Sequence, residues 1–230
     1  MNLLAIDSAT ELLSVAVASG EGRYSFEADA GPRHSALLLE VIDMLLEKAG
    51  LRPGDLDGVV CMKGPGSFTG LRVGYAAAKG ICMARGIPMA ALPTLDCMAR
   101  PFSFFPGLVM PLIDAKQKSF FTALYRKNVK ISGYFDAGIP FLAENMTKAR
   151  EGAEKVLLTG PGGPMACRDF SGLFPGEIFC SSDRRGYAGN MLEIAMTDGI
   201  LRGKGEDEFF SGPEYIRKSD AEARAEIIEL

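Results

Sequence analysis

Short apolar runs and two long helical patterns alternate along the first hundred residues. The elements expected from them are strands at 3–6, 12–18 and 24–27, a helix at 35–49, a strand at 58–62, a helix at 70–85 and a strand at 87–91. In the first helix the acidic residues Glu40, Asp43 and Glu47 recur at three and four positions, which is helical spacing. Gly50 and Gly86 follow the two helices as stop signals.

The same order of elements returns in the second half of the chain. The elements expected there are strands at 108–113, 120–126 and 129–135, a helix near 146–154 and a strand at 156–159. A strand closes on an aspartate at both Asp7 and Asp114. A strand runs into Gly-Pro-Gly at both Gly64 and Gly160. This repetition predicts an α/β protein of two similar lobes, each with the order βββαβα.

The Phe- and Pro-rich stretch 101–107 is the expected linker between the lobes. We therefore place the N-terminal lobe at 1–102 and the C-terminal lobe at 103–230. The most charged part of the chain is 213–226, for which we expect a solvated terminal helix or tail.

Composition narrows the class of protein. With 230 residues, of which 47% are hydrophobic and 23% charged, the chain has the composition of a folded protein. Its formal charge of −4 disfavours unaided binding to nucleic acid, because phosphate neutralisation needs clustered Lys and Arg. A partner is expected to hold any nucleic acid. The chain has neither a secretion signal at its start nor a run of about 18 apolar residues, so we expect no membrane span.

The cysteine pattern favours a reducing compartment. The five cysteines form no Cys-x-x-Cys pair and leave an odd count, which predicts reduced thiols in a cytoplasmic protein and no zinc site. They are Cys61, Cys82, Cys97, Cys167 and Cys180.

Asp7, Ser8 and Thr10 follow the first expected strand. A carboxylate and small hydroxyl residues at the end of a central strand suit a hydrated cation or a phosphate. The alternative is a hairpin turn in which Asp7 hydrogen-bonds nearby backbone.

Residues 64–72 read GPGSFTGLR. Gly64 and Gly66 permit backbone angles and close approaches that other residues forbid, and Ser67 and Thr69 can cap the helix that follows. Because a helix start attracts anions, Gly64, Gly66 and Ser67 are candidates for a phosphate loop. The loop lacks the lysine of a P-loop, and the alternative is a tight turn between strand and helix.

His34 is the only histidine in the chain. A metal site with two imidazoles therefore cannot be assembled, and no Gly-x-Ser-x-Gly nucleophile turn accompanies His34. We expect His34 to cap the helix at 35–49 or to face water. No catalytic residue and no metal ligand is predicted.

Both helices of the first lobe are too apolar for the single stripe that one core can bury. Leaving apolar surface in water costs roughly 25 cal/mol per Å², so we infer that these helices form a protein interface. The expected interface residues are Leu38, Val41, Ile42, Leu45, Leu71, Gly74, Tyr75, Ala78 and Ile81. The alternative places both helices deep between two layers of their own fold.

Six motifs together resemble those of one known family. In chain order they are AIDSAT, PRHSALLLEVI, GPGSFTGLR, LPTL, IDAK and PEYIR. With them the chain resembles the TsaB (YeaZ) family over nearly its full length. The resemblance implies the duplicated actin-like fold of the ASKHA class of ATPases, which is ribonuclease H-like. It also implies a cytoplasmic, non-catalytic subunit of the bacterial machinery that places threonylcarbamoyl on N6 of adenosine 37 in tRNAs.

The resemblance also implies that this chain lacks the metal site of its catalytic relative. TsaD, the catalytic relative, carries a metal-binding His-x-x-x-His where this chain has Thr94 and Met98. Neither a metal nor the metallopeptidase activity of the older family label is therefore expected. DSAT replaces the more usual DTST and IDAK replaces IDAR, which leaves Asp7, Thr10 and Asp114 in place. No cofactor is required, and ATP or ADP is allowed at the interface of the complex.

The partners implied by the resemblance are TsaD, which would bind through the two helices, and the ATPase TsaE, which would join the pair. Without TsaD, self-association through the same surface is expected. Any contact with tRNA would be made through the complex.

Two functions of different class follow. The first is a scaffold subunit that binds and activates TsaD and has no turnover of its own. The alternative is an independent actin-like ATPase or kinase that uses Asp7, Asp114 and the two glycine loops around Mg-ATP. Protease activity is disfavoured by the lone His34.

Overall fold

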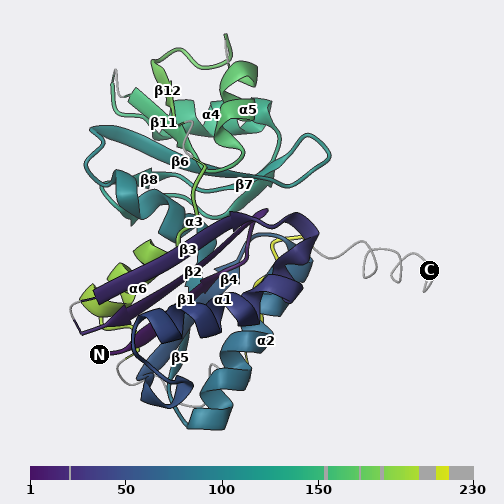
Figure 1. The fold of residues 1–230 in the computed structure, drawn as a ribbon. Coiled ribbons are helices and arrows are strands. Elements are labelled where there is room, and N and C mark those ends of the chain that lie inside the picture. Colours follow the sequence, from purple (N-terminus) through teal and green to yellow (C-terminus); the bar gives the residue numbers. More distant parts are fainter. Residues whose placement is uncertain (21, 153–154, 171, 182–183, 202–210, 218–230) are drawn as a thin grey trace.

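The computed structural model describes residues 1–20, 22–152, 155–170, 172–181, 184–201 and 211–217. The chain folds into two α/β lobes that lie against one another, the N-terminal lobe purple to blue and the C-terminal lobe teal to green (Figure 1). No described helix combines the length and the hydropathy needed to cross a membrane.

The N-terminal lobe follows the expected order of elements. These are β1 (Leu3–Asp7), β2 (Leu12–Ser19), β3 (Gly22–Asp29), α1 (His34–Lys48), β4 (Gly58–Gly64), α2 (Phe68–Arg85) and β5 (Met89–Pro93). The strands lie in the order β3-β2-β1-β4-β5, with β1 antiparallel to β2 and parallel to β4. The central strand β1 is buried along its whole length, because helices cover both faces of the sheet.

The C-terminal lobe repeats this topology. Its elements are β6 (Gly107–Asp114), β7 (Phe120–Thr122), β8 (Tyr125–Arg126), β9 (Val129–Lys130), β10 (Phe135–Ala137), α4 (Ile139–Ala149), β11 (Lys155–Thr159), α5 (Gly163–Asp169) and β12 (Ile178–Cys180). The path β10-β7-β6-β11-β12 matches that of the first sheet, with β8 and β9 as an added hairpin beside β6. The predicted duplication is therefore confirmed.

Three expected elements of the second lobe differ in their bounds. The strand expected at 129–135 is replaced by two short strands, β9 and β10. The strand expected at 120–126 is divided into β7 and β8, because the end of β6 pairs with β7 while Leu108 and Val109 at its beginning pair with β8. The helix expected near 146–154 begins earlier, at Ile139, with Pro140 in its first turn where a missing N–H costs nothing.

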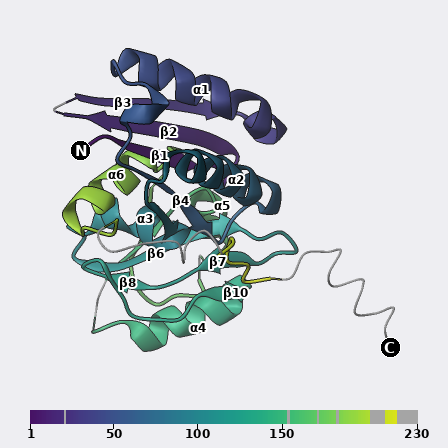
Figure 2. The same cartoon turned by 90° about the horizontal axis from the view of Figure 1, so that it is seen from below.

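The chain returns to the first lobe after completing the second. Helix α6 (Ala188–Thr197) packs on the N-terminal sheet, opposite α1 and α2, where Ala188 and Met191 share a core with Leu3 and Ala5. Figure 2 shows α6 beside β1, on the far side from α1. This corrects the expectation that 103–230 forms one C-terminal lobe, since the pattern of α6 alone does not say which sheet it covers.

The lobes share one apolar core at their junction. Helix α3 (Thr94–Ala99) follows β5, and Leu95 and Met98 lie in the same core as Val109 and Tyr125 of the second lobe. Within the described part of the chain, short 3-10 turns lie at Gly31–Arg33, Pro53–Asp55 and Arg100–Phe102. The part of the expected charged tail that the structure describes, 213–217, lies between the lobes and is not helical. Residues 218–226 lie outside the described residues.

Candidate functional site

A cleft of about 940 Å³ lies between the two lobes. Its walls are the turns that follow β1 and β6, the start of α2, residues just before α6, and residues 214–217. Its size falls in the range of pockets that hold small ligands and cofactors. If the expected phosphate-loop residues bind a ligand, they should therefore line this cleft.

Asp7 is buried behind the cleft and does not line it. Its Oδ1 accepts a hydrogen bond from the N–H of Ala9 at 3.1 Å, and its Oδ2 accepts one from the N–H of Tyr187 at 3.0 Å. Burial raises the pKa of Asp7 to about 6, against the effect of the two N–H donors. The carboxylate thus joins the end of β1 to the start of α6.

Ser8 also serves the fold, whereas Thr10 reaches the cleft. The Oγ of Ser8 donates to the carbonyl of Gly70 at 2.8 Å, and it lies against Gly74, so that α2 sits directly on the end of β1. A side chain at Gly74 would overlap this hydroxyl. Thr10 lines the cleft, and its Oγ1 accepts the N–H of Leu12 at 3.3 Å. The local contact of the hairpin-turn alternative is made by Asp7 with Ala9, whereas Ser8 bonds to α2.

The residues of the glycine loop also differ in whether they line the cleft. Gly66 and Ser67 line the cleft, and the N–H of Ser67 donates to the carbonyl of Ala9 at 2.7 Å. As predicted, Ser67 caps α2, its Oγ accepting the N–H of Gly70 at 3.2 Å. Gly64 does not line the cleft; its φ of +121° and its contact with the carbonyl of Glu214 both require glycine.

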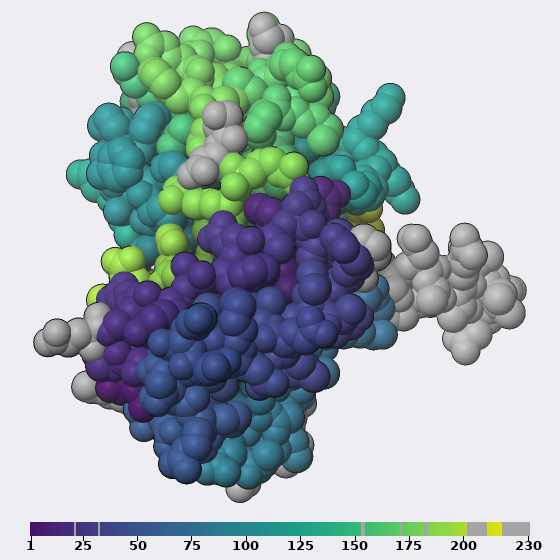
Figure 3. Space-filling view, viewed as in Figure 1, coloured from purple at the N-terminus to yellow at the C-terminus, as the bar shows by residue number. Residues whose placement is uncertain are grey.

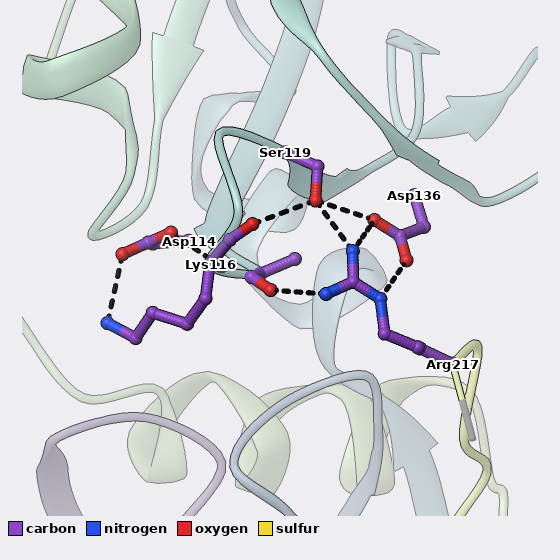
Figure 4. A network of polar contacts seen from close by, with 6 residues as sticks. Asp114, Lys116, Ser119, Asp136 and Arg217 are labelled. Carbon is purple, nitrogen blue, oxygen red and sulfur yellow. Dashed lines mark hydrogen bonds and ion pairs between the residues drawn. The ribbon is translucent and has the colours of Figure 1, made fainter. Parts of the chain in front are cut away.

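The turn after β6 carries a second group of polar residues (Figure 4). The Nζ of Lys116 lies 3.0 Å from the carboxylate of Asp114, whose Oδ1 also accepts the N–H of Lys116. Partial burial acts to raise the pKa of Asp114, but these hydrogen bonds hold it below its usual range. The second aspartate of the repeat, like the first, is engaged by groups of the protein itself.

Arg217 is the functional residue that sequence reasoning missed. Its guanidinium binds both carboxylate oxygens of Asp136 at 2.6 Å, the carbonyl of Ala115 at 2.7 Å and the Oγ of Ser119 at 2.7 Å (Figure 4). Arg217 belongs to the PEYIR motif, but nothing in the motif indicates partners about eighty or more positions earlier. The expectation of a solvated tail was wrong for this residue.

The charged side chains of the cleft wall already have partners in the protein. Lys116 is paired with Asp114, and Arg184 lies 3.2 Å from Asp29 and 3.5 Å from Glu11. Among the described residues no group of three His, Cys, Asp or Glu side chains could hold a metal ion. The feature of the cleft that best fits a phosphate is the exposed start of α2, where Ser67 lies.

The expectation for the partner interface must be corrected, because most of the expected residues are buried. Leu38, for example, is 1% exposed, and all but one of the expected nine pack on the sheet of their own lobe. The buried eight are Leu38, Val41, Ile42, Leu45, Leu71, Gly74, Tyr75 and Ala78, while Ile81 is half-buried. The inner faces of both helices therefore cannot touch a partner.

The outer face of α1 and α2 carries large apolar side chains among charged ones. Leu39 is 60% exposed, Met44 38% and Met83 68%, and small residues such as Ala76 and Gly80 lie on the outside of α2. α1 and α2 form part of the surface of the N-terminal lobe in Figure 3. The alternative that encloses both helices within their own fold is therefore also wrong.

The structure also places the histidine and the two residues of α3 that were considered for a metal site. His34 is the first residue of α1 and is buried, so it does not face water as expected; its Nε2 lies 3.2 Å from the carbonyl of Glu11. Thr94 and Met98 are fully buried in α3.

The expectation of five reduced thiols is corrected, because Cys167 and Cys180 form a disulfide between α5 and β12. The other three cysteines are buried and are not disulfide-bonded.

Comparison with known proteins supports a relation to tRNA-modifying proteins. The family model described as TsaD, tRNA N6-adenosine threonylcarbamoyltransferase, matches residues 28–137. The tRNA threonylcarbamoyladenosine biosynthesis protein TsaB of Bacillus subtilis is 26% identical over 97% of both chains. The protein of the same name from Escherichia coli is 33% identical over 56% of both chains.

Solved structures show the same fold. The crystal structure of an uncharacterized Pseudomonas aeruginosa protein with similarity to peptidase YEAZ has a TM-score of 0.77 and 23% identity, covering 94% of this chain and 99% of that one. YeaZ from the same organism has a TM-score of 0.71 and 22% identity over the same shares. Together with the repeated strand order, this confirms the duplicated α/β fold, which the chain shares with the two YeaZ structures.

Proposed function

We propose that this chain is a member of the TsaB (YeaZ) family and that it acts in the formation of threonylcarbamoyladenosine in tRNA as a non-catalytic subunit that binds and activates TsaD. The observation that carries the proposal is the outer face of α1 and α2, where Leu39 and Met83 are largely exposed. Large apolar side chains exposed on a helical surface favour contact with another protein.

The polar groups between the lobes support a subunit without turnover. Both carboxylates that would serve an actin-like ATPase, Asp7 and Asp114, accept hydrogen bonds from groups of the protein itself. Asp7 is buried away from the cleft, so a ligand there would not meet it. An independent ATPase or kinase is for this reason the weaker alternative.

The remaining parts of the proposal concern partners. TsaE joins the pair with TsaD, self-association uses the same helical face, and tRNA is held through the complex because the chain carries a net charge of −4. The cytoplasm is where such a complex meets tRNA. No cofactor is required; ATP or ADP at the interface of the complex would use the start of α2 and the hydroxyls of Thr10 and Ser67.

Reconstitution tests the proposal. We expect the purified chain to form a complex with TsaD, seen by light scattering, and to raise tRNA modification when TsaE and the threonylcarbamoyl adenylate are supplied. The variant Leu39→Glu should lose both effects, because a charge on the outer face would be buried in the contact. Val129→Glu is the matched control, since Val129 is exposed to a similar degree on the C-terminal lobe. Equal modification by TsaD without this chain contradicts the proposal.

A further inference from the structure

Residues 211–217 run between the two lobes and bind to both. In Figure 2 this yellow segment lies beside α2 on one side and β7 and β10 on the other. Tyr215 of this segment also packs against the apolar core that α3 and α6 share. The segment therefore adds contacts with both lobes beside their shared core.

The N-terminal lobe holds the segment along one flank of α2. The N–H of Glu214 donates to the carbonyl of Lys63 at 2.7 Å, and the Nζ of Lys79 donates to the carbonyl of Ser211 at 2.5 Å. The ring of Tyr215 lies 4.6 Å from that of Phe68, centre to centre. Further along the flank, the Nε of Arg72 donates to the hydroxyl of Tyr215 at 3.2 Å.

The C-terminal lobe holds the other end through Arg217. Two parallel bonds between a guanidinium and a carboxylate are among the strongest hydrogen bonds in proteins, and Asp136 is four-fifths buried here. Arg217 also binds Ala115 and Ser119, the two residues that flank the turn at 116–118. All three residues of that turn have positive φ, between +52° and +62°, a conformation that persists where its surroundings fix it.

We propose that residues 211–217 are a latch between the lobes, which holds them in one relative orientation and sets the width of the cleft. Tyr215 fastens the latch to α2, and Arg217 fastens it to the turn after β6. Because residues 214–217 also line the cleft, a ligand that enters must fit the space the latch leaves. The latch is a property of the isolated chain and does not rest on the proposed function.

Hydrogen exchange on the full-length chain tests the latch from each end. In Arg217→Gln, the amide of Glu214, which is bonded to the first lobe, should exchange about tenfold faster or more, because one end of the latch is free. In Tyr215→Ala, the amides of Ala115 and Ser119 in the second lobe should exchange faster in turn. Such reciprocity is required of two coupled contacts.

A matched control and a second measurement decide the outcome. Arg52 makes the same kind of two-pronged contact with Asp55, but within one turn of the N-terminal lobe, so Arg52→Gln should leave both regions unchanged. Small-angle X-ray scattering of Arg217→Gln should show a larger radius of gyration than the parent chain. Faster exchange at 211–217 without any change in scattering would overturn the latch, because these residues would then make only a local contact. Unchanged exchange overturns it too, and Asp136→Asn repeats the test if Arg217→Gln does not fold.

Discussion

The carboxylate of Asp7 accepts a hydrogen bond from the backbone N–H of Tyr187, a residue that follows it by 180 positions. Tyr187 is the residue before α6, so this bond fastens the returning helix to the central strand of the first lobe. Burial of the same carboxylate makes the stability of the protein depend on pH.

The pKa of Asp7 is raised by burial from 3.8 in the unfolded chain to about 6 in the fold. Between these values the folded state binds more protons than the unfolded state, so stability falls as the pH rises through this window. The contribution is fully present below pH 3.8 and is lost above pH 6, with a total of about 3 kcal/mol. Urea unfolding from about pH 4 to about pH 7.5 measures this change.

Other groups also titrate in that range, and Asp7→Asn separates them. Its amide is neutral at every pH, so the free energy of unfolding of the parent chain minus that of the variant should fall by about 3 kcal/mol from low to high pH. A flat difference for Asp7→Asn would mean that the carboxyl group is not perturbed.

The same variant discriminates the two functional hypotheses. Because Asp7 is covered and does not line the cleft, we expect Asp7→Asn to leave ATP hydrolysis by the isolated chain at the background rate of the parent. Circular dichroism establishes that the variant is folded. Hydrolysis by the parent chain that disappears in the variant would favour the independent ATPase.

Much of the fold could be predicted from local patterns. The periods of 3.6 and 2 locate α1, α2 and β1 within a few residues, and the repeated Asp and Gly-Pro-Gly landmarks reveal the duplication. The attachment of α6 to the first lobe could not be predicted, because it depends on contacts such as that of Tyr187 with Asp7 that no local pattern encodes. The same holds for Arg217, whose partners lie 81 and more positions away.

Two glycines of α2 should respond in opposite ways to the same substitution. Gly74 lies against the hydroxyl of Ser8, which is fixed by its bond to Gly70, so Gly74→Ala should destabilise the protein by about 1–3 kcal/mol. Gly80 is exposed with open space around it, so Gly80→Ala should stabilise the protein by about 0.5–1 kcal/mol through helix propensity. Thermal or urea unfolding compares the two, and equal effects would contradict the close approach of α2 to β1.

The outer face of α1 shows what a hydrophobic pattern cannot predict. Leu37, Leu38 and Leu39 are consecutive and equally apolar, so the sequence of α1 does not say which of them faces the sheet. Only the packing decides, and it buries Leu38 while leaving Leu39 exposed. The existence of an apolar outer surface was therefore predictable from composition, but its residues were not.

Substitutions on the two faces of the helices should separate stability from binding. Leu38→Ala removes a buried side chain and should lower the free energy of unfolding by about 2–5 kcal/mol, while the folded fraction binds TsaD as the parent does. Met83→Glu changes a largely exposed residue, so stability should change by less than about 0.5 kcal/mol. Its affinity for TsaD should nevertheless fall by about tenfold or more, because the charge would be buried in the contact. Unfolding in urea and titration calorimetry with TsaD measure the two quantities. Unchanged affinity in Met83→Glu would exclude this end of α2 from the interface.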